Sequence, residues 1–199
     1  MSYPATERYD LVPAPGGVVL VQELVNSTGF RPALDDDLLA DVERATAWFE
    51  TFLPVWSEET GRTAPAIELD DEGLEELRAL RSELLAALNR QDGAGANGVN
   101  GTVGIALAPD GSVRFSARQT SLAKWVRNTA ILEAGLSQQI GTWPRLKMCA
   151  NPPCIIAFYD RSKNRTAAWH DAKTCGNAVN LRASRARRRA AGGEPVDAV

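Results

Sequence analysis

Three cysteines and a single histidine are the strongest constraint on how this 199-residue chain can fold. They form two pairs, each separated by four residues, with fifteen residues between the pairs. Two pairs of sulfur and nitrogen ligands around a short loop are typical of a tetrahedral structural zinc site. We therefore expect one structural Zn²⁺ per chain, held by Cys149, Cys154, His170 and Cys175.

A structural zinc site is not the sole way to account for these four residues. They can be unrelated, or Cys149 and Cys154 can be a redox pair, although the four-residue spacing and the second pair argue against it. A catalytic zinc is the weaker option, because four protein ligands leave no coordination position for water. An odd number of cysteines, all late in the chain, does not suit a secreted disulfide scaffold and predicts a reducing, cytoplasmic location.

Charge is divided very unevenly along the chain, although the net charge is only -3. Residues 1–144 hold 21 acidic and 11 basic side chains, whereas residues 145–191 hold 11 basic side chains against Asp160 and Asp171. Such a basic segment favours a polyanionic partner. We expect a final helix with an arginine face suited to phosphates or a DNA major groove. The predicted DNA contacts are Arg182, Arg185, Arg188, Arg189, Lys163 and Arg165. A solvated face, or a surface that docks on an acidic protein, is the alternative.

The flanks of the ligands predict local structure. Cys175 is expected at the start of the final helix, where the helix dipole favours a thiolate, and Trp169 is expected to shield the metal from water. A strand is predicted around Ile156 and Phe158. In the final helix, packing is expected from Val179, Leu181 and Ala186.

Hydrophobic periodicity predicts a mainly helical α+β domain over residues 15–140, after an irregular lead-in at 1–17. It is followed by a zinc finger over 145–190 and a disordered tail over 191–199. The first expected element is a short buried helix within 18–27, with a strand at 18–21 as the alternative. The others are a helix from near Leu34 to Pro54 capped by Asp35, Asp36 and Asp37, a helix from Asp70 or Asp71 to Asn89, a β-hairpin around Pro109–Ser112, and a helix from Thr120 to Gln139.

Evidence for an enzyme is weak, so we expect none. No glycine-rich phosphate loop is present, and the sole histidine is already a predicted zinc ligand. The acidic clusters at 35–37 and 70–72 suit helix caps better than cation or acid–base sites. Trp48, Trp56 and Trp125 can enclose a pocket for a small-molecule effector or simply form the core. The chain has no apolar run of about 20 residues and no signal-peptide pattern, so no membrane association is expected.

The C-terminal segment resembles the CGNR zinc finger family. The resemblance lies in Arg145-Leu-Lys-Met-Cys149, Cys154, Phe158-Tyr-Asp160, Ser162-Lys-Asn164, Trp169 and Cys175-Gly-Asn177. That family joins such a finger to an N-terminal ABATE domain in bacterial stress-induced transcription regulators, and Glu23-Leu-Val-Asn26-Ser27 is similar to its L-D-[FL]-V-N-T signature. The resemblance implies the same four zinc ligands and an N-terminal domain that senses a small ligand.

Two positions depart from the family pattern. His170 stands where the family usually has cysteine, which still allows a Cys3His site, and Ala178 replaces the arginine that gives the family its name. Arg182 and Arg185 are the candidates to compensate. The sequence therefore predicts a bacterial, zinc-containing, DNA-binding transcription regulator, modulated by a ligand or by homodimer contact. The alternative is a zinc-stabilised protein-interaction module that does not bind DNA.

Overall fold

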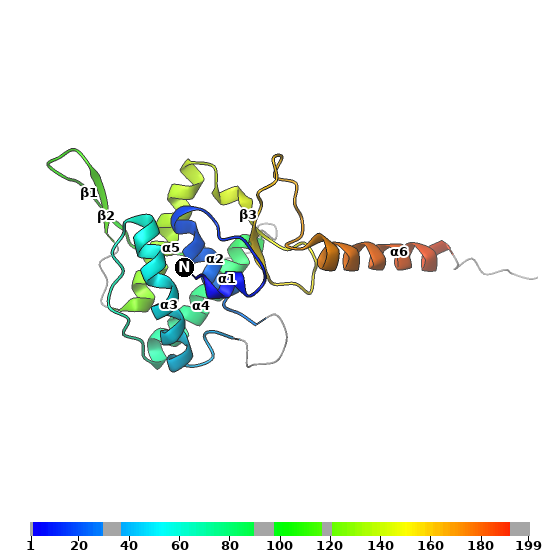
Figure 1. Cartoon of the computed structure of the whole chain (residues 1–199), viewed down its shortest axis with the longest axis horizontal. Helices are drawn as coiled ribbons and strands as arrows, with labels where there is room; N and C mark the ends of the chain where they lie inside the picture. Colours follow the sequence, from blue (N-terminus) through cyan, green and yellow to red (C-terminus); the bar gives the residue numbers. More distant parts are fainter. Residues whose placement is uncertain (1, 30–36, 90–97, 117–120, 192–199) are drawn as a thin grey trace, which may run out of the picture.

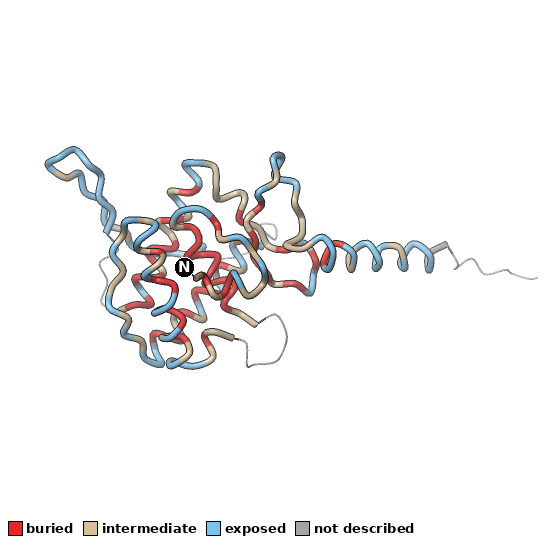
Figure 2. The backbone as a smooth tube through the Cα atoms, viewed as in Figure 1, coloured by how far each residue is buried: buried red, intermediate tan, exposed pale blue. Residues whose placement is uncertain are grey.

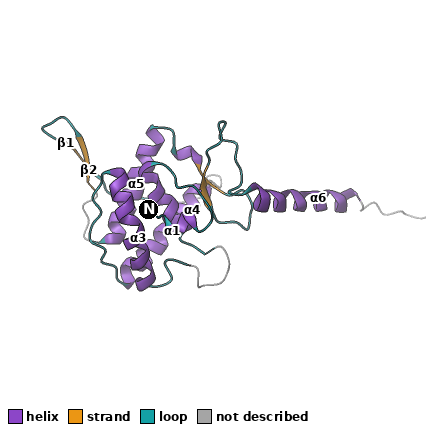
Figure 3. Ribbon diagram, viewed as in Figure 1, coloured by secondary structure: helices purple, strands orange, loops and turns teal. Residues whose placement is uncertain are grey.

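The structure is a computed structural model that describes residues 2–29, 37–89, 98–116 and 121–191. The predicted class, a mainly helical α+β fold with a finger that ends in a basic helix, is confirmed (Figure 3). The elements, in chain order, are α1 (Pro4–Glu7), η1 (Gly16–Val18), α2 (Val19–Asn26), α3 (Val42–Thr60), α4 (Asp71–Asn89), β1 (Gly104–Leu107), β2 (Val113–Ser116), α5 (Leu122–Gln139), η3 (Trp143–Arg145), β3 (Leu146–Met148), β4 (Ala157–Tyr159), η4 (Ala172–Gly176) and α6 (Asn177–Ala191).

Helix α2 lies at the centre of the helical body, surrounded by α1, α3, α4 and α5 (Figure 1). All eight of its residues are buried, which confirms the predicted short buried helix rather than a strand. It carries three buried polar side chains, Gln22, Glu23 and Asn26, and each makes hydrogen bonds to backbone groups of another segment. A buried polar group is tolerated only when it is paired, so these residues fix what packs against α2.

The prediction of an irregular lead-in is wrong for part of residues 1–17, because α1 forms there and packs in the core. The Glu23 carboxylate accepts hydrogen bonds from the backbone N–H groups of Ala5 (3.1 Å) and Thr6 (2.7 Å) and from Trp48 Nε1 (3.1 Å). Burial raises the pKa of Glu23, although these bonds act in the opposite direction. Further along, Gln22 accepts from the Ala14 N–H at 2.6 Å. The N-terminal segment is thus held by side chains that cannot be recognised from its own sequence.

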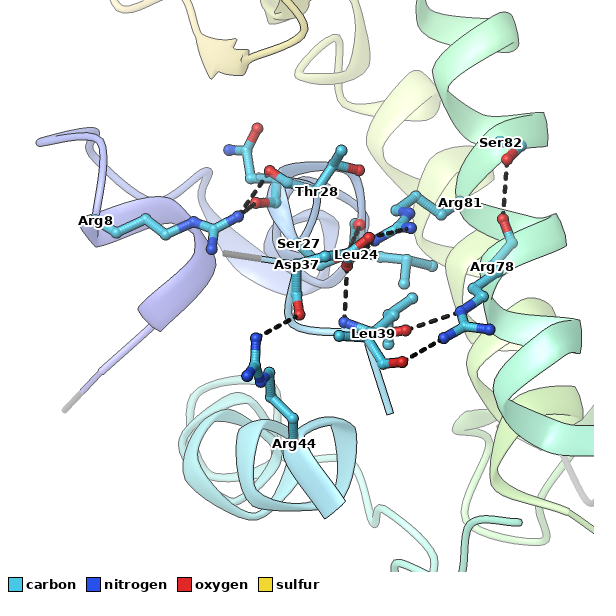
Figure 4. Close-up of polar contacts among 12 residues, drawn as sticks. Arg8, Leu24, Ser27, Thr28, Asp37, Leu39, Arg44, Arg78, Arg81 and Ser82 are labelled. Atoms are coloured by element: carbon cyan, nitrogen blue, oxygen red, sulfur yellow. Dashed lines mark hydrogen bonds and ion pairs between the residues drawn. The ribbon is translucent and has the colours of Figure 1, made fainter. Parts of the chain in front are cut away.

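The predicted start of the next helix near Leu34 is wrong; residues 30–36 lie outside the described part, and α3 begins at Val42. Its N-cap is Asp41, whose side chain accepts from the Arg44 N–H at 2.8 Å. Asp37, predicted as a cap, instead forms a two-pronged ion pair with Arg81 of α4, at 2.6 and 2.9 Å (Figure 4). The same carboxylate bonds to the Leu39 N–H, so it stabilises the turn before α3.

The predicted end of this helix at Pro54 is also wrong, because α3 continues to Thr60 with Pro54 inside it. A proline inside a helix costs about 3 kcal/mol. Pro54 is exposed, whereas Phe52, Leu53 and Trp56 around it are buried, and their packing offsets that cost. The helix ends at Gly61, which adopts the left-handed conformation with φ +67°.

Helices α4 and α5 and the hairpin β1–β2 lie where they were predicted. The two helices each carry buried residues, whereas both strands of the hairpin are exposed along their whole length (Figure 2). Ile105 pairs with Phe115, and Leu107 with Val113, so these four apolar side chains share one exposed face. The tryptophans at 48, 56 and 125 are ordinary core residues, although Trp56 and Trp125 also line a hollow of about 660 Å³ beside β2.

The β3–β4 hairpin of the C-terminal segment packs into the same core as the helices. Leu146 and Ala157 are buried there beside α2 and α4. The Asn26 side chain bonds to both backbone groups of Ala157: its Nδ2 donates to the carbonyl at 2.9 Å, and its Oδ1 accepts from the N–H at 2.8 Å. This pair of bonds places the metal-ligand loops next to the helical body.

Candidate metal centre

The four predicted ligands come together, with their ligand atoms all within 4.8 Å of one another. Cys149, Cys154 and Cys175 are buried, and His170 is half-buried with Nδ1 3.4 Å from Cys154 Sγ. A tetrahedral zinc with Zn–S bonds of about 2.3 Å separates its sulfur ligands by about 3.8 Å. The cluster therefore has the donor types, the number and approximately the size that one zinc ion requires.

The first pair lies on a tight turn between β3 and β4. Cys149 follows β3, and its N–H donates to the Ile156 carbonyl at 3.0 Å. Within the Ala-Asn-Pro-Pro turn, the Cys154 N–H donates to the Asn151 carbonyl at 2.7 Å. The two prolines limit the unfolded chain's freedom, which lowers the entropic cost of bringing the thiols together.

The second pair lies on the approach to α6. Cys175 is placed by η4, a π-helical turn that precedes α6, so the predicted helix start at Cys175 is close but not correct. The Asp171 side chain caps this turn by accepting from the Lys173 N–H (2.7 Å) and the Thr174 hydroxyl (2.9 Å). The Cys175 N–H donates to the Asp171 carbonyl, which directs the thiol toward His170 and the first pair.

An apolar shell covers the cluster. Trp169 packs against it as predicted, together with Tyr9 and Leu11. A Cβ atom at Gly176 would lie 3.2 Å from the Trp169 ring, so the glycine lets the indole approach the π turn closely. Tyr9 and Leu11 were not predicted, and no local signal could have identified them, because they reach the site only through the folding of the N-terminal segment.

Electrostatics also suit a cation. A hydrogen bond with Cys154 lowers the pKa of the Cys149 thiol to about 4, whereas the same bond and burial raise the pKa of Cys154. A zinc ion held by these two sulfurs would bind both of them as thiolates. Asn151 Nδ2 also donates to Cys175 Sγ at 3.2 Å, a bond that stabilises a thiolate.

The predicted DNA contacts are distributed over α6 and the loop before His170. Arg185, Arg188 and Arg189 are exposed on α6, and Lys163 and Arg165 are exposed on the loop. Arg182 is also exposed, but its Nη2 donates to Asn151 Oδ1. The expected packing by Leu181 and Ala186 is wrong, because both are exposed and α6 projects from the body (Figures 1 and 2).

Two further basic residues of the segment are used inside the fold. Arg145 donates to the carbonyls of Asp160 and Ser162, at 2.9 and 2.8 Å. Lys147 forms a 2.7 Å ion pair with Asp160, whose side chain is fully buried. Burial favours a higher pKa for Asp160, but the bonds from Lys147 and Ser162 outweigh it and lower the pKa to about 2. A charge count alone could not separate these structural bases from exposed ones.

This geometry defines the class of the C-terminal segment: a zinc finger with a single structural Cys3His site suited to one ion. The family comparison agrees, since residues 145–188 match the CGNR zinc finger. The chain thus contains a CGNR zinc finger domain, whereas no ABATE domain is detected in the N-terminal part. A comparison with curated proteins found no match. Among the described residues, no helix has both the length and the apolar character needed to cross a bilayer.

Proposed function

We propose that the protein is a DNA-binding transcription regulator in which zinc shapes the finger and α6 contacts DNA. The observation that carries this proposal is the exposure of Arg185, Arg188 and Arg189 on a helix that projects from the body (Figure 2). A helix that displays several guanidinium groups fits the phosphates that border a DNA groove. In the described part of the chain, none of these three arginines has a hydrogen-bond or ion-pair partner.

The charge of the remaining chain supports one orientation of approach. Residues 1–144 carry ten more acidic than basic side chains, so the helical body is repelled by phosphates. The exposed loop with Lys163 and Arg165 lies beside the base of α6 (Figure 1). Both basic elements therefore face DNA together when the acidic body points away. Regulation would reach them through Asn26, which joins α2 to β4.

The test is DNA binding by fluorescence anisotropy across a series of salt concentrations. A protein that neutralises Z phosphates shows log K falling with log salt with a slope of about -0.9Z. The triple variant Arg185→Ala/Arg188→Ala/Arg189→Ala should therefore reduce the slope by about 3 and weaken binding similarly for all sequences. The control is Arg114→Ala/Lys124→Ala, which removes two exposed basic side chains outside the finger, one on β2 and one on α5. Equal binding by the wild type and the triple variant would refute the proposal.

A second candidate is a zinc-stabilised protein-interaction module. The exposed apolar face of the β1–β2 hairpin, which lies outside the finger, offers a contact surface for such a partner, since Ile105 and Leu107 are 70 and 74% exposed. Exposed apolar patches often mark protein contacts. A partner retained on the immobilised protein after nuclease treatment, and lost in Ile105→Ser/Leu107→Ser, would support this candidate. Loss of the partner on nuclease treatment would instead indicate a nucleic-acid bridge.

A further inference from the structure

The side-chain amide of Asn151 lies between the metal site and the basic helix. Asn151 is only 6% exposed and belongs to the turn that carries Cys149 and Cys154. Its Nδ2 donates to Cys175 Sγ at 3.2 Å, and its Oδ1 accepts from Arg182 Nη2. One residue thus connects a zinc ligand to the first arginine of α6.

Elementary electrostatics requires this orientation of the amide. A thiolate accepts hydrogen bonds and a guanidinium only donates them, so Nδ2 must face Cys175 and Oδ1 must face Arg182. The reversed amide would place an oxygen against the sulfur and an NH₂ group against the arginine. The amide dipole is therefore aligned between a negative and a positive group, which strengthens both bonds.

The charge balance of the site favours a nearby cation. Zinc with three thiolates and a neutral histidine carries a net charge of about -1. Arg182 supplies a positive charge and is linked to the cluster through Asn151, which contacts both Arg182 and Cys175. It lies four residues after Ala178, which is one turn along α6 and on the same face of the helix. Among the arginines in the described part of α6, Arg182 alone has a hydrogen-bond partner.

We infer that Arg182 is a positioning residue that holds α6 to the metal site through Asn151, rather than a phosphate contact. A bound zinc ion would be held by Cys175; Cys175 and Arg182 fix the Asn151 amide, and Asn151 sets the direction in which α6 leaves the finger. That direction determines where Arg185, Arg188 and Arg189 are presented. Loss of zinc then releases the amide and the helix together. This role belongs to the finger alone and does not depend on whether DNA binds.

Two measurements on the full zinc-loaded chain test this role: the rate of zinc release to a colorimetric chelator, and hydrogen exchange of the α6 backbone amides. Removing a residue that supports a metal ligand typically costs about 10–100-fold in metal affinity, and we expect that for Asn151→Ala. Arg182→Ala should release zinc several-fold faster and lose amide protection in the first two turns of α6. Arg182→Lys should recover part of both, because it keeps the charge but loses the planar donor group.

The control is Arg185→Ala, which removes the same charge from the same helix and should change neither measurement. If Arg182→Ala behaves like Arg185→Ala in both, the inference is overturned. The double variant Asn151→Ala/Arg182→Ala should release zinc no faster than Asn151→Ala, since the link is already broken; additive effects would contradict the link. Should Asn151→Ala fail to fold with zinc, the comparison of Arg182→Ala with Arg185→Ala still decides.

Discussion

Replacing Asn26 by alanine tests how strongly the helical body and the finger are joined. The Asn26 amide makes two hydrogen bonds, at 2.9 and 2.8 Å, to the backbone carbonyl and N–H of Ala157. Both residues are essentially buried, at 1 and 0% exposure, so water cannot replace the lost amide. The variant therefore leaves an unpaired donor and an unpaired acceptor in the core.

The expected loss follows from the cost of these two orphaned groups. Each unsatisfied buried group costs about 1–3 kcal/mol, so the variant should lose roughly 2–6 kcal/mol, with a central value of about 4. That is a large part of the about 5–15 kcal/mol that stabilises an ordinary domain. Asn26→Asp should not rescue the loss, because its second oxygen would face the Ala157 carbonyl and cannot donate.

The assay is urea denaturation of the zinc-loaded protein, followed by circular dichroism and by tryptophan fluorescence. Asn164→Ala is the control, because Asn164 is an exposed asparagine of the finger loop. In Asn26→Ala, the urea concentration at the midpoint of unfolding should fall while the dependence of the free energy on urea stays unchanged. Alternatively, the transitions seen by circular dichroism and by fluorescence should separate, because the finger loosens from α2. A loss below about 1 kcal/mol with coincident signals would refute the reasoning, because buried unpaired groups cannot cost so little.

Two further predictions concern the finger. Elemental analysis should give one zinc per chain. Because metal affinity is part of the folding free energy, treatment with a strong chelator or the substitution Cys175→Ser should unfold residues 145–175, as measured by hydrogen exchange. A zinc-free protein with an intact finger would contradict this prediction. Asp160→Asn should cost about 2 kcal/mol at neutral pH, because the folded pKa of about 2 lies below the ordinary value of 3.8. That stabilisation is present above pH 3.8 and is lost as the pH falls toward 2. The free energies of unfolding of variant and wild type, measured against pH, should therefore converge near pH 2. A difference in free energy that stays constant across the titration would contradict the prediction.

Local patterns predicted most elements because their causes are local. The apolar periodicity of α4 and of α5 and the Pro109–Ser112 turn each act within a few residues, and all three elements are present. The errors arose where a distant residue intervened. Asp37 resembles a helix cap in the sequence, but Arg81, 44 residues away, uses its carboxylate, so Asp41 becomes the cap.

The metal ligands and the basic helix follow from residue types and spacing, since ligand chemistry and helical period are properties of short segments. The contacts that place them are different in kind. Asn26 meets Ala157 across 131 residues, Tyr9 and Leu11 cover the cysteines, and Arg182, although exposed, donates to Asn151. Each of these pairings forms because folding brings distant groups together and removes them from water. Local sequence patterns cannot predict such contacts.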